Sequence, residues 1–123
     1  MEKLNILTEK IIGCAIEVHR NLGPGLLESI YEKALCYEFG KIGLKYKNQV
    51  VTPIIYKGTS LGKHRIDLLV EDEVIVELKA VDRNDPVFVA QVMSYLRLAN
   101  KKLGLLMNFN VTVLRKGIKR IIL

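Results

Sequence analysis

Two short apolar runs, residues 64–70 and 74–80, stand on either side of a charged tripeptide, residues 71–73. Runs of β-forming residues with a polar turn between them are typical of a β-hairpin. The second run continues as VIVELKAV and carries Glu77 and Lys79 in its middle. Charged residues are unusual inside a strand that belongs in a hydrophobic core. Glu77 and Lys79 therefore indicate that this hairpin has a functional role.

Side chains alternate between the two faces of a strand. Glu77 and Lys79 are therefore expected on one face with Ile75, and on the partner strand Asp67 is expected to share a face with Leu69. The opposite, apolar faces are predicted to hold Val74, Val76 and Leu78 on one strand and Ile66, Leu68 and Val70 on the other.

The length of the turn decides which residues face each other. If residues 71–73 form the turn, Val70 pairs with Val74, and counting back sets Asp67 opposite Glu77. Directly paired residues have Cβ atoms about 5 Å apart, so the two carboxylates would meet beside Lys79. A two-residue turn would instead pair Asp67 with Leu78.

Two like charges opposite each other destabilise a sheet, so a compensating charge is expected at Asp67 and Glu77. Carboxylate oxygens are preferred ligands of Mg²⁺, which takes one or two of them together with waters and phosphate oxygens. A bound metal polarises a phosphoryl oxygen and activates water, and the ammonium of Lys79 would steady that water or the developing charge. The alternative is that Glu77 and Lys79 belong to an ordinary solvated strand face.

The remaining sequence predicts three helices and further strands around this hairpin. Helical spacing or capping signals indicate helices at residues 4–20, 26–39 and 86–99. Apolar β-forming runs indicate strands at residues 45–56, 103–109 and 118–123, with a further short one at 111–114. Pro53 implies an edge position or a bulge, Asp85 and Pro86 open the third helix, and residues 57–63 are predicted to be a turn.

This order of elements predicts the α/β class. The arrangement is α-α-β-β-β-α-β-β, a mixed central sheet with helices packed on it. A chain of 123 residues fits one compact domain, so we expect a single domain over residues 1–123. No apolar run is long enough to span a bilayer and the first residues lack a signal-like stretch, so no membrane association and a cytoplasmic location are expected.

Charge is segregated along the chain. All thirteen acidic residues precede Pro86, while the last 38 residues carry seven basic ones. A second stretch, between Glu38 and Asp67, contains six basic residues and no acidic one. Such segregation suggests one positive face that attracts polyanions such as nucleic acid. The alternative is a merely solvated basic surface.

Three further residues are candidates for the same site. Glu28 lies on a partly apolar helix stripe from which its carboxylate could point inward, although a first-turn Glu is also a common partner of the helix dipole. Gln91 and Tyr95 lie one turn apart on the third helix and project together. Taken alone, residues of these types at this spacing are more often ordinary helix residues.

Gly25, Glu28 and Tyr31 form the signature Gly-x-x-Glu-x-x-Tyr, and the segment VHRNLGPGLLESIYEKAL around them resembles the GxxExxY protein family. By that resemblance the chain is similar to the PD-(D/E)XK nuclease superfamily, which has a restriction-endonuclease-like core of a mixed sheet flanked by helices. The resemblance extends from about Leu7 to the C-terminus. Ile66 replaces the Pro of the motif name.

The resemblance implies a role for each candidate residue. Asp67 matches the motif's Asp, Glu77 and Lys79 match its (D/E)XK part, and Glu28 is similar to an acidic residue on the helix before the sheet. The implied chemistry is phosphodiester hydrolysis dependent on Mg²⁺ or Mn²⁺, with Glu28, Asp67 and Glu77 around the metal and Lys79 beside the water. The resemblance also implies that Gln91 and Tyr95 support the catalytic site and the nucleic-acid backbone.

Three functions remain open at this level. The first is a metal-dependent nuclease, the second a nucleic-acid-binding module that cleaves poorly, and the third an interaction or regulatory subunit, which the small size suggests. Salt-sensitive binding without turnover would mark the second. The expected partner is nucleic acid, with DNA favoured over RNA, and a homodimer is suggested because one small domain holds one site.

Overall fold

The computed structural model describes the whole chain, residues 1–123, and begins with two helices. The first, α1 (Glu2–Leu22), forms because apolar side chains recur at helical spacing, and its buried stripe includes Ile11 and Ala15. The second, α2 (Glu28–Lys41), starts after the glycine- and proline-rich turn and buries Leu35. None of the helices combines the length and apolar character that crossing a membrane requires.

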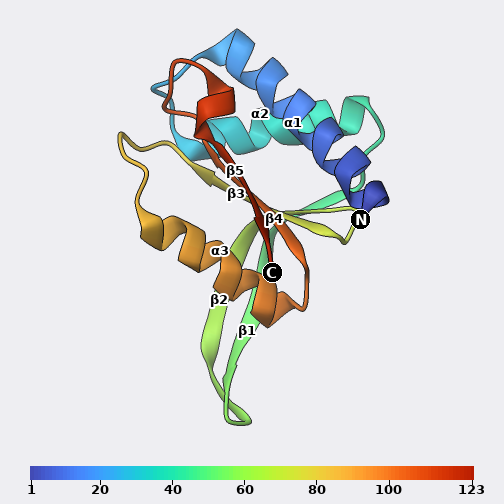
Figure 1. The fold of residues 1–123 in the computed structure, drawn as a ribbon, viewed down its shortest axis with the longest axis vertical. Helices are drawn as coiled ribbons and strands as arrows, with labels where there is room; N and C mark the ends of the chain where they lie inside the picture. Colours follow the sequence, from blue (N-terminus) through green and yellow to red (C-terminus); the bar gives the residue numbers. More distant parts are fainter.

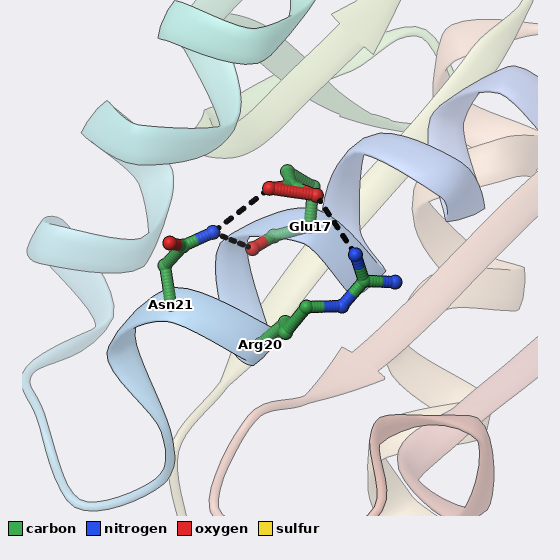
Figure 2. A network of polar contacts seen from close by, with 3 residues as sticks. All are labelled: Glu17, Arg20 and Asn21. Atoms are coloured by element: carbon green, nitrogen blue, oxygen red, sulfur yellow. Dashed lines mark hydrogen bonds and ion pairs between the residues drawn. The ribbon is translucent and has the colours of Figure 1, made fainter.

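The exposed end of α1 is tied together by its own side chains (Figure 2). The carboxylate of Glu17 accepts hydrogen bonds from Asn21, at 2.9 Å, and from Arg20, at 3.4 Å. The amide of Asn21 also donates to the backbone carbonyl of Glu17 at 2.8 Å. These contacts stabilise the last turn before Gly23, where the helix ends with a positive φ of 69°.

Five strands form one mixed sheet in the order β1-β2-β3-β4-β5. They are β1 (Tyr46–Tyr56), β2 (Thr59–Val70), β3 (Val74–Lys79), β4 (Leu103–Asn108) and β5 (Ile118–Ile122). Neighbouring strands are antiparallel except β3 and β4, which are parallel because the helix α3 (Pro86–Ala99) connects them. The predicted α/β architecture and element order are confirmed.

Helices cover both faces of the sheet (Figure 1). The larger core lies between the sheet and the pair α1 and α2, and the smaller core lies between the sheet and α3. β3 separates the two cores, because Val76 packs in the first and Ile75 in the second. The predicted alternation along this strand is confirmed, and its centre is buried on both faces.

The start of α3 matches the sequence signals. The carboxylate of Asp85 caps the helix by accepting from the backbone N–H of Val87 at 3.0 Å, and Pro86 is the first helical residue. Asn100 ends the helix in the left-handed conformation, with a φ of 56°. The predicted bounds of this helix are confirmed.

The prediction of a turn over residues 57–63 is wrong. β1 runs to Tyr56 and β2 begins at Thr59, so only Lys57 and Gly58 form the turn. Both have positive φ, 49° and 81°, which suits a two-residue hairpin turn whose twist matches that of the strands. The result is a long hairpin that extends well beyond the rest of the molecule (Figure 1). Pro53 lies on β1, which is an edge strand of the sheet, as expected. The pairing register between β1 and β2 shifts next to it, between Ile54 and Ile55.

The prediction of a short strand at residues 111–114 is also wrong. A single turn of 3₁₀ helix, η1 (Leu114–Gly117), occupies part of this segment. β4 already pairs with β5, through Met107 and Ile118, and with β3 on its other side. Both edges of β4 are therefore occupied, so the intervening segment cannot pair with this strand.

Candidate functional site

The strands β2 and β3 separate at the position of the two carboxylates. Their pairing includes Val70 with Val74 and ends at Leu68 with Val76, so the predicted three-residue turn is confirmed. Beyond this point β2 continues beside β1 into the long hairpin, and β3 continues beside β4. We call this divergence the fork. Asp67 and Glu77 are the first residues beyond the last strand pair.

Each carboxylate at the fork binds the backbone of the opposite strand. The backbone N–H of Asp67 donates to Oε1 of Glu77 at 3.2 Å, and the N–H of Leu78 donates to Oδ2 of Asp67 at 2.9 Å. The side chains thus take the place of ladder hydrogen bonds where the strands diverge. One oxygen of each carboxylate remains without a backbone donor.

The predicted alternation along β2 is wrong at Ile66. This side chain packs in the core beneath α3, on the same side of the sheet as Leu69, rather than with Leu68. The alternation therefore slips by one residue next to Asp67. On β1, Gln49 has a positive φ of 52° at the position opposite Asp67, and this pair is missing from the ladder. The local distortion of both strands opens the sheet at the fork.

Glu77 is a buried acid beside a second acid. It is only 7% exposed. Burial, and next the negative charge of Asp67, raise the pKa of Glu77 from 4.5 to about 9, and a hydrogen bond between the two carboxyl groups acts in the same direction. Near neutral pH the pair therefore shares a proton. A cation that replaced this proton would compensate the same repulsion.

Glu28 approaches the fork from α2, of which it is the first residue. Partial burial of its carboxyl group raises the pKa of Glu28, while nearby Lys79 lowers it and Asp67 raises it further. The nearby backbone of Ala80 also lowers the pKa of Glu28. Glu28 and Asp67 share a surface hollow whose other lining residues are Ser29, Glu32, Gln49 and Leu78.

The other two residues of the Gly-x-x-Glu-x-x-Tyr signature hold Glu28 in place. Gly25 has a φ of 98°, which few other residues adopt, in the turn before α2. The hydroxyl of Tyr31 donates to the carbonyl of Gly23 at 2.6 Å and accepts from the N–H of Leu26 at 3.1 Å. Its buried ring stacks on Phe109 with a centroid distance of 4.5 Å. Tyr31 thus fastens the turn from which Glu28 emerges.

Lys79 lies at the end of β3, close to Glu28 and Glu77. Its ammonium lies 4.5 Å from the centre of the Phe88 ring on α3. Its backbone carbonyl accepts from the N–H of Phe109 at 2.9 Å. The sequence predicted Lys79 beside Glu77 and Asp67, and the structure adds Glu28 as a neighbour.

Asn108 is a residue that sequence reasoning missed. It is 6% exposed, donates to the carbonyl of Val81 at 2.9 Å and accepts from the N–H of Val81 at 3.2 Å. These two bonds tie the segment after Lys79 to the end of β4. The only signal in the sequence is a single polar residue that closes an apolar strand, and strands far from any functional site commonly end in the same way.

The two candidate residues on α3, Gln91 and Tyr95, differ in how they relate to the acid pair at the fork. Burial, and next the charges of Glu77 and Asp67, raise the pKa of Tyr95, which places its hydroxyl in the field of the pair. The ring of His64 stacks on Tyr95 at a centroid distance of 4.3 Å, a contact the sequence did not indicate. Gln91 lies half-buried one turn before Tyr95.

The donor set at the fork suits a hard cation. It consists of carboxylate oxygens, and Mg²⁺ commonly uses one or two of these with waters and phosphate oxygens. No three acidic, histidine or cysteine side chains already converge closely enough to ligate one ion by themselves. Asp67 and Glu77 therefore fit as a two-carboxylate site, with Glu28 adjacent to them.

Comparison with known proteins identifies one family. The model of the PD-(D/E)XK nuclease superfamily matches residues 5–121. Neither the curated proteins nor the solved structures include a significant match.

Proposed function

Because the chain belongs to the PD-(D/E)XK nuclease superfamily, we propose that it hydrolyses phosphodiester bonds in nucleic acid with the help of a divalent cation, Mg²⁺ or Mn²⁺. The observation that carries the proposal is the pair of a buried acid, Glu77, and a half-buried acid, Asp67, beside Lys79. Burying the carboxyl group of Glu77 next to that of Asp67 costs stability, and a bound cation would offset that cost.

In this proposal Asp67 and Glu77 hold the cation through the oxygens that have no backbone donor, and Glu28 completes the ligand set. When bound, the cation polarises the scissile phosphoryl group and lowers the pKa of the attacking water. The ammonium of Lys79 orients that water and offsets the charge that develops on the phosphate. Burial of β3 on both faces keeps Glu77 and Lys79, which both lie on this strand, at a constant separation.

The α3 residues act as supports. The hydroxyl of Tyr95 lies near the acid pair and offers a hydrogen bond to a carboxylate or to a phosphate oxygen. Gln91, one turn away, offers an amide donor in the same direction. Their proposed role is to position the acid pair and the nucleic-acid backbone.

The decisive experiment combines metal binding with cleavage. Titration calorimetry with Mg²⁺ and Mn²⁺ is carried out on the wild type and on Asp67→Asn, and labelled duplex DNA, single-stranded DNA and RNA are incubated with each protein. Asp67→Asn should lose metal binding and cleavage together. Lys79→Met should keep metal binding but lose at least a hundredfold in cleavage, as removal of a charge-stabilising group typically does.

The matched control is Lys10→Met, an exposed lysine on α1 far from the fork along the chain. It should cleave like the wild type. Unchanged cleavage by Asp67→Asn or Lys79→Met would refute the proposed site.

A second candidate function is nucleic-acid binding without turnover. It is favoured by the observation that three ligating side chains do not already converge at the fork. Under this alternative, wild-type protein would bind nucleic acid in a salt-sensitive manner, and neither Mg²⁺ nor Mn²⁺ would produce cleavage.

A further inference from the structure

The outer part of the β1–β2 hairpin has no packing partner. Thr52, which is 7% exposed, is the last buried residue on β1. From residue 53 to residue 63 every residue except Ile54 is exposed. We call residues 53–63 the arm. A two-stranded ribbon with solvent on both faces is marginally stable by itself, so the fold gains little from maintaining it.

The base of the hairpin, in contrast, is held from both sides. On the α2 side, the amide of Gln49 donates to Glu32 at 2.7 Å, and Asn48 donates to the same carboxylate at 3.3 Å. On the α3 side, His64 stacks on Tyr95. The direction in which the arm leaves the molecule (Figure 1) is therefore set by contacts next to the fork.

The charges on and beside the arm are all positive. No acidic residue occurs between Glu38 and Asp67. Lys57 lies at the turn, and Lys63 and Arg65 follow on β2. None of these three residues takes part in an ion pair.

The positive side chains also line up with the fork. His64 packs against α3, so alternation places Lys63 and Arg65 on the opposite face of β2. Asp67 lies two residues after Arg65 along β2 and borders the hollow on the α2 side. Two basic side chains, Lys63 and Arg65, therefore lie on one face of the hairpin between the fork and the turn, where Lys57 adds a third positive charge.

We propose that the arm lies along duplex DNA, with Lys57, Lys63 and Arg65 contacting phosphates while the fork engages the backbone. This inference rests on the proposed nuclease function and specifies its substrate class. The major groove of B-form DNA admits a two-stranded β-ribbon, whereas the major groove of A-form RNA is too deep and narrow for side chains to reach its bases. The three unpaired positive charges complement the phosphates of nucleic acid.

The length of the arm predicts how many base pairs of the duplex the protein contacts. Eight residue steps separate Asp67 from Thr59 on β2. At about 3.3 Å per residue this distance is roughly 26 Å, which corresponds to about eight base pairs of B-form DNA. The protein should therefore contact the duplex for about eight base pairs on one side of the fork.

The test measures binding of labelled duplex DNA in EDTA, so that cleavage does not interfere, over a range of salt concentrations. The arm variant combines Lys57→Gln, Lys63→Gln and Arg65→Gln. Each lost phosphate contact reduces the magnitude of the slope of log K against log salt by about 0.9. The salt dependence of the arm variant should therefore be shallower by about two to three. The control combines Lys3→Gln, Lys10→Gln and Lys33→Gln, the same charge change at helix positions away from the arm.

A second measurement uses duplexes shortened stepwise on one side. The affinity of the wild type should drop once fewer than about eight base pairs remain on the arm side, and the arm variant should not show this drop. A slope that falls equally in the arm variant and the control would overturn the inference. So would an arm variant that binds DNA normally but loses self-association in sedimentation, because the arm would then contact a second copy of the chain.

The two proposals fail in distinguishable ways. An arm-dependent salt slope without cleavage under any metal condition would refute the catalytic proposal and leave the arm's role standing. Cleavage with an unchanged salt slope would refute the arm's role and leave catalysis standing. A wild type that has no affinity for duplex DNA refutes the arm's role outright.

Discussion

Asp67 and Glu77 each accept a hydrogen bond from the backbone of the other's strand, at 2.9 Å and 3.2 Å. The amide of Leu78 donates to the first, and the amide of Asp67 donates to the second. This reciprocal arrangement closes the ladder where β2 leaves β3 and brings the half-buried Asp67 next to the buried Glu77. The stability of the fold and the proposed chemistry therefore depend on the same pair.

Replacing Glu77 with Gln should make stability less dependent on pH. The pKa of Glu77 rises from 4.5 to about 9 in the folded state. Between these values the unfolded chain releases a proton that the folded chain retains, so the free energy of unfolding falls by about 1.4 kcal/mol per pH unit. Below pH 4.5 both states are protonated, and this penalty is absent.

Urea unfolding at several pH values measures the effect. Glu77→Gln should differ little from the wild type near pH 4.5 and become progressively more stable than it toward pH 8. Glu9→Gln, an exposed substitution on α1, is the control and should follow the wild type. An equal difference between Glu77→Gln and the wild type at all pH values would contradict the raised pKa.

Binding of Mg²⁺ should release a proton from the acid pair. A carboxylate must be ionised to ligate a metal, and Glu77, with a pKa of about 9, is protonated at neutral pH. Affinity should therefore increase with pH, up to about tenfold per unit below pH 9. Calorimetry in two buffers of different ionisation enthalpy counts the protons. Binding with no proton release near pH 7 would show that Glu77 is not a ligand.

Tyr31→Phe should destabilise the fold without altering its core. The variant keeps the ring that stacks on Phe109 but loses the hydrogen bonds with Gly23 and Leu26. The expected loss is about 1–2 kcal/mol, measured by urea unfolding. Tyr37→Phe on the same helix provides the control, since Tyr37 is 66% exposed, and it should have little effect. Equal stabilities of the two variants would argue against the anchoring role of Tyr31.

Gly117→Ala should also destabilise the protein. A Cβ at this position would collide with the backbone carbonyl of Asn108, so η1 or the end of β4 would have to move. We expect a loss of about 1–3 kcal/mol. Gly40→Ala is the contrasting change, because Gly40 lies in α2 with open space around it, and alanine there should add up to about 1 kcal/mol. Thermal unfolding distinguishes the two, and equal shifts would contradict the predicted clash.

The sequence was sufficient to predict features that depend on local signals. Asp85 with Pro86 marked the start of α3, and period-two alternation assigned the faces of β3 correctly. The three-residue turn was predicted correctly, and Asp67 and Glu77 are the first residues beyond the last pair that it sets. In each case a few neighbouring residues determine the outcome, so no knowledge of distant contacts was needed.

Features that depend on contacts between distant segments were not predictable. The slip of alternation at Ile66 arises where β2 leaves β3, and the sequence does not mark this divergence. The role of Asn108 depends on Val81, 27 residues away. Likewise, the segment 57–63 contains two glycines, which suggested a loop, but pairing with β1 draws most of it into β2.

The exposed outer part of the β1–β2 hairpin has a consequence for how relatives of this chain can diverge. Nothing packs on residues 53–63. A cross-strand pair, made of one residue from β1 and one from β2, can therefore be inserted or removed there without disturbing either core. Removing two residues from each strand preserves which side chains face the fork and shortens the hairpin by about 7 Å. The length of the arm can therefore change, in evolution or by design, while the residues at the fork stay the same.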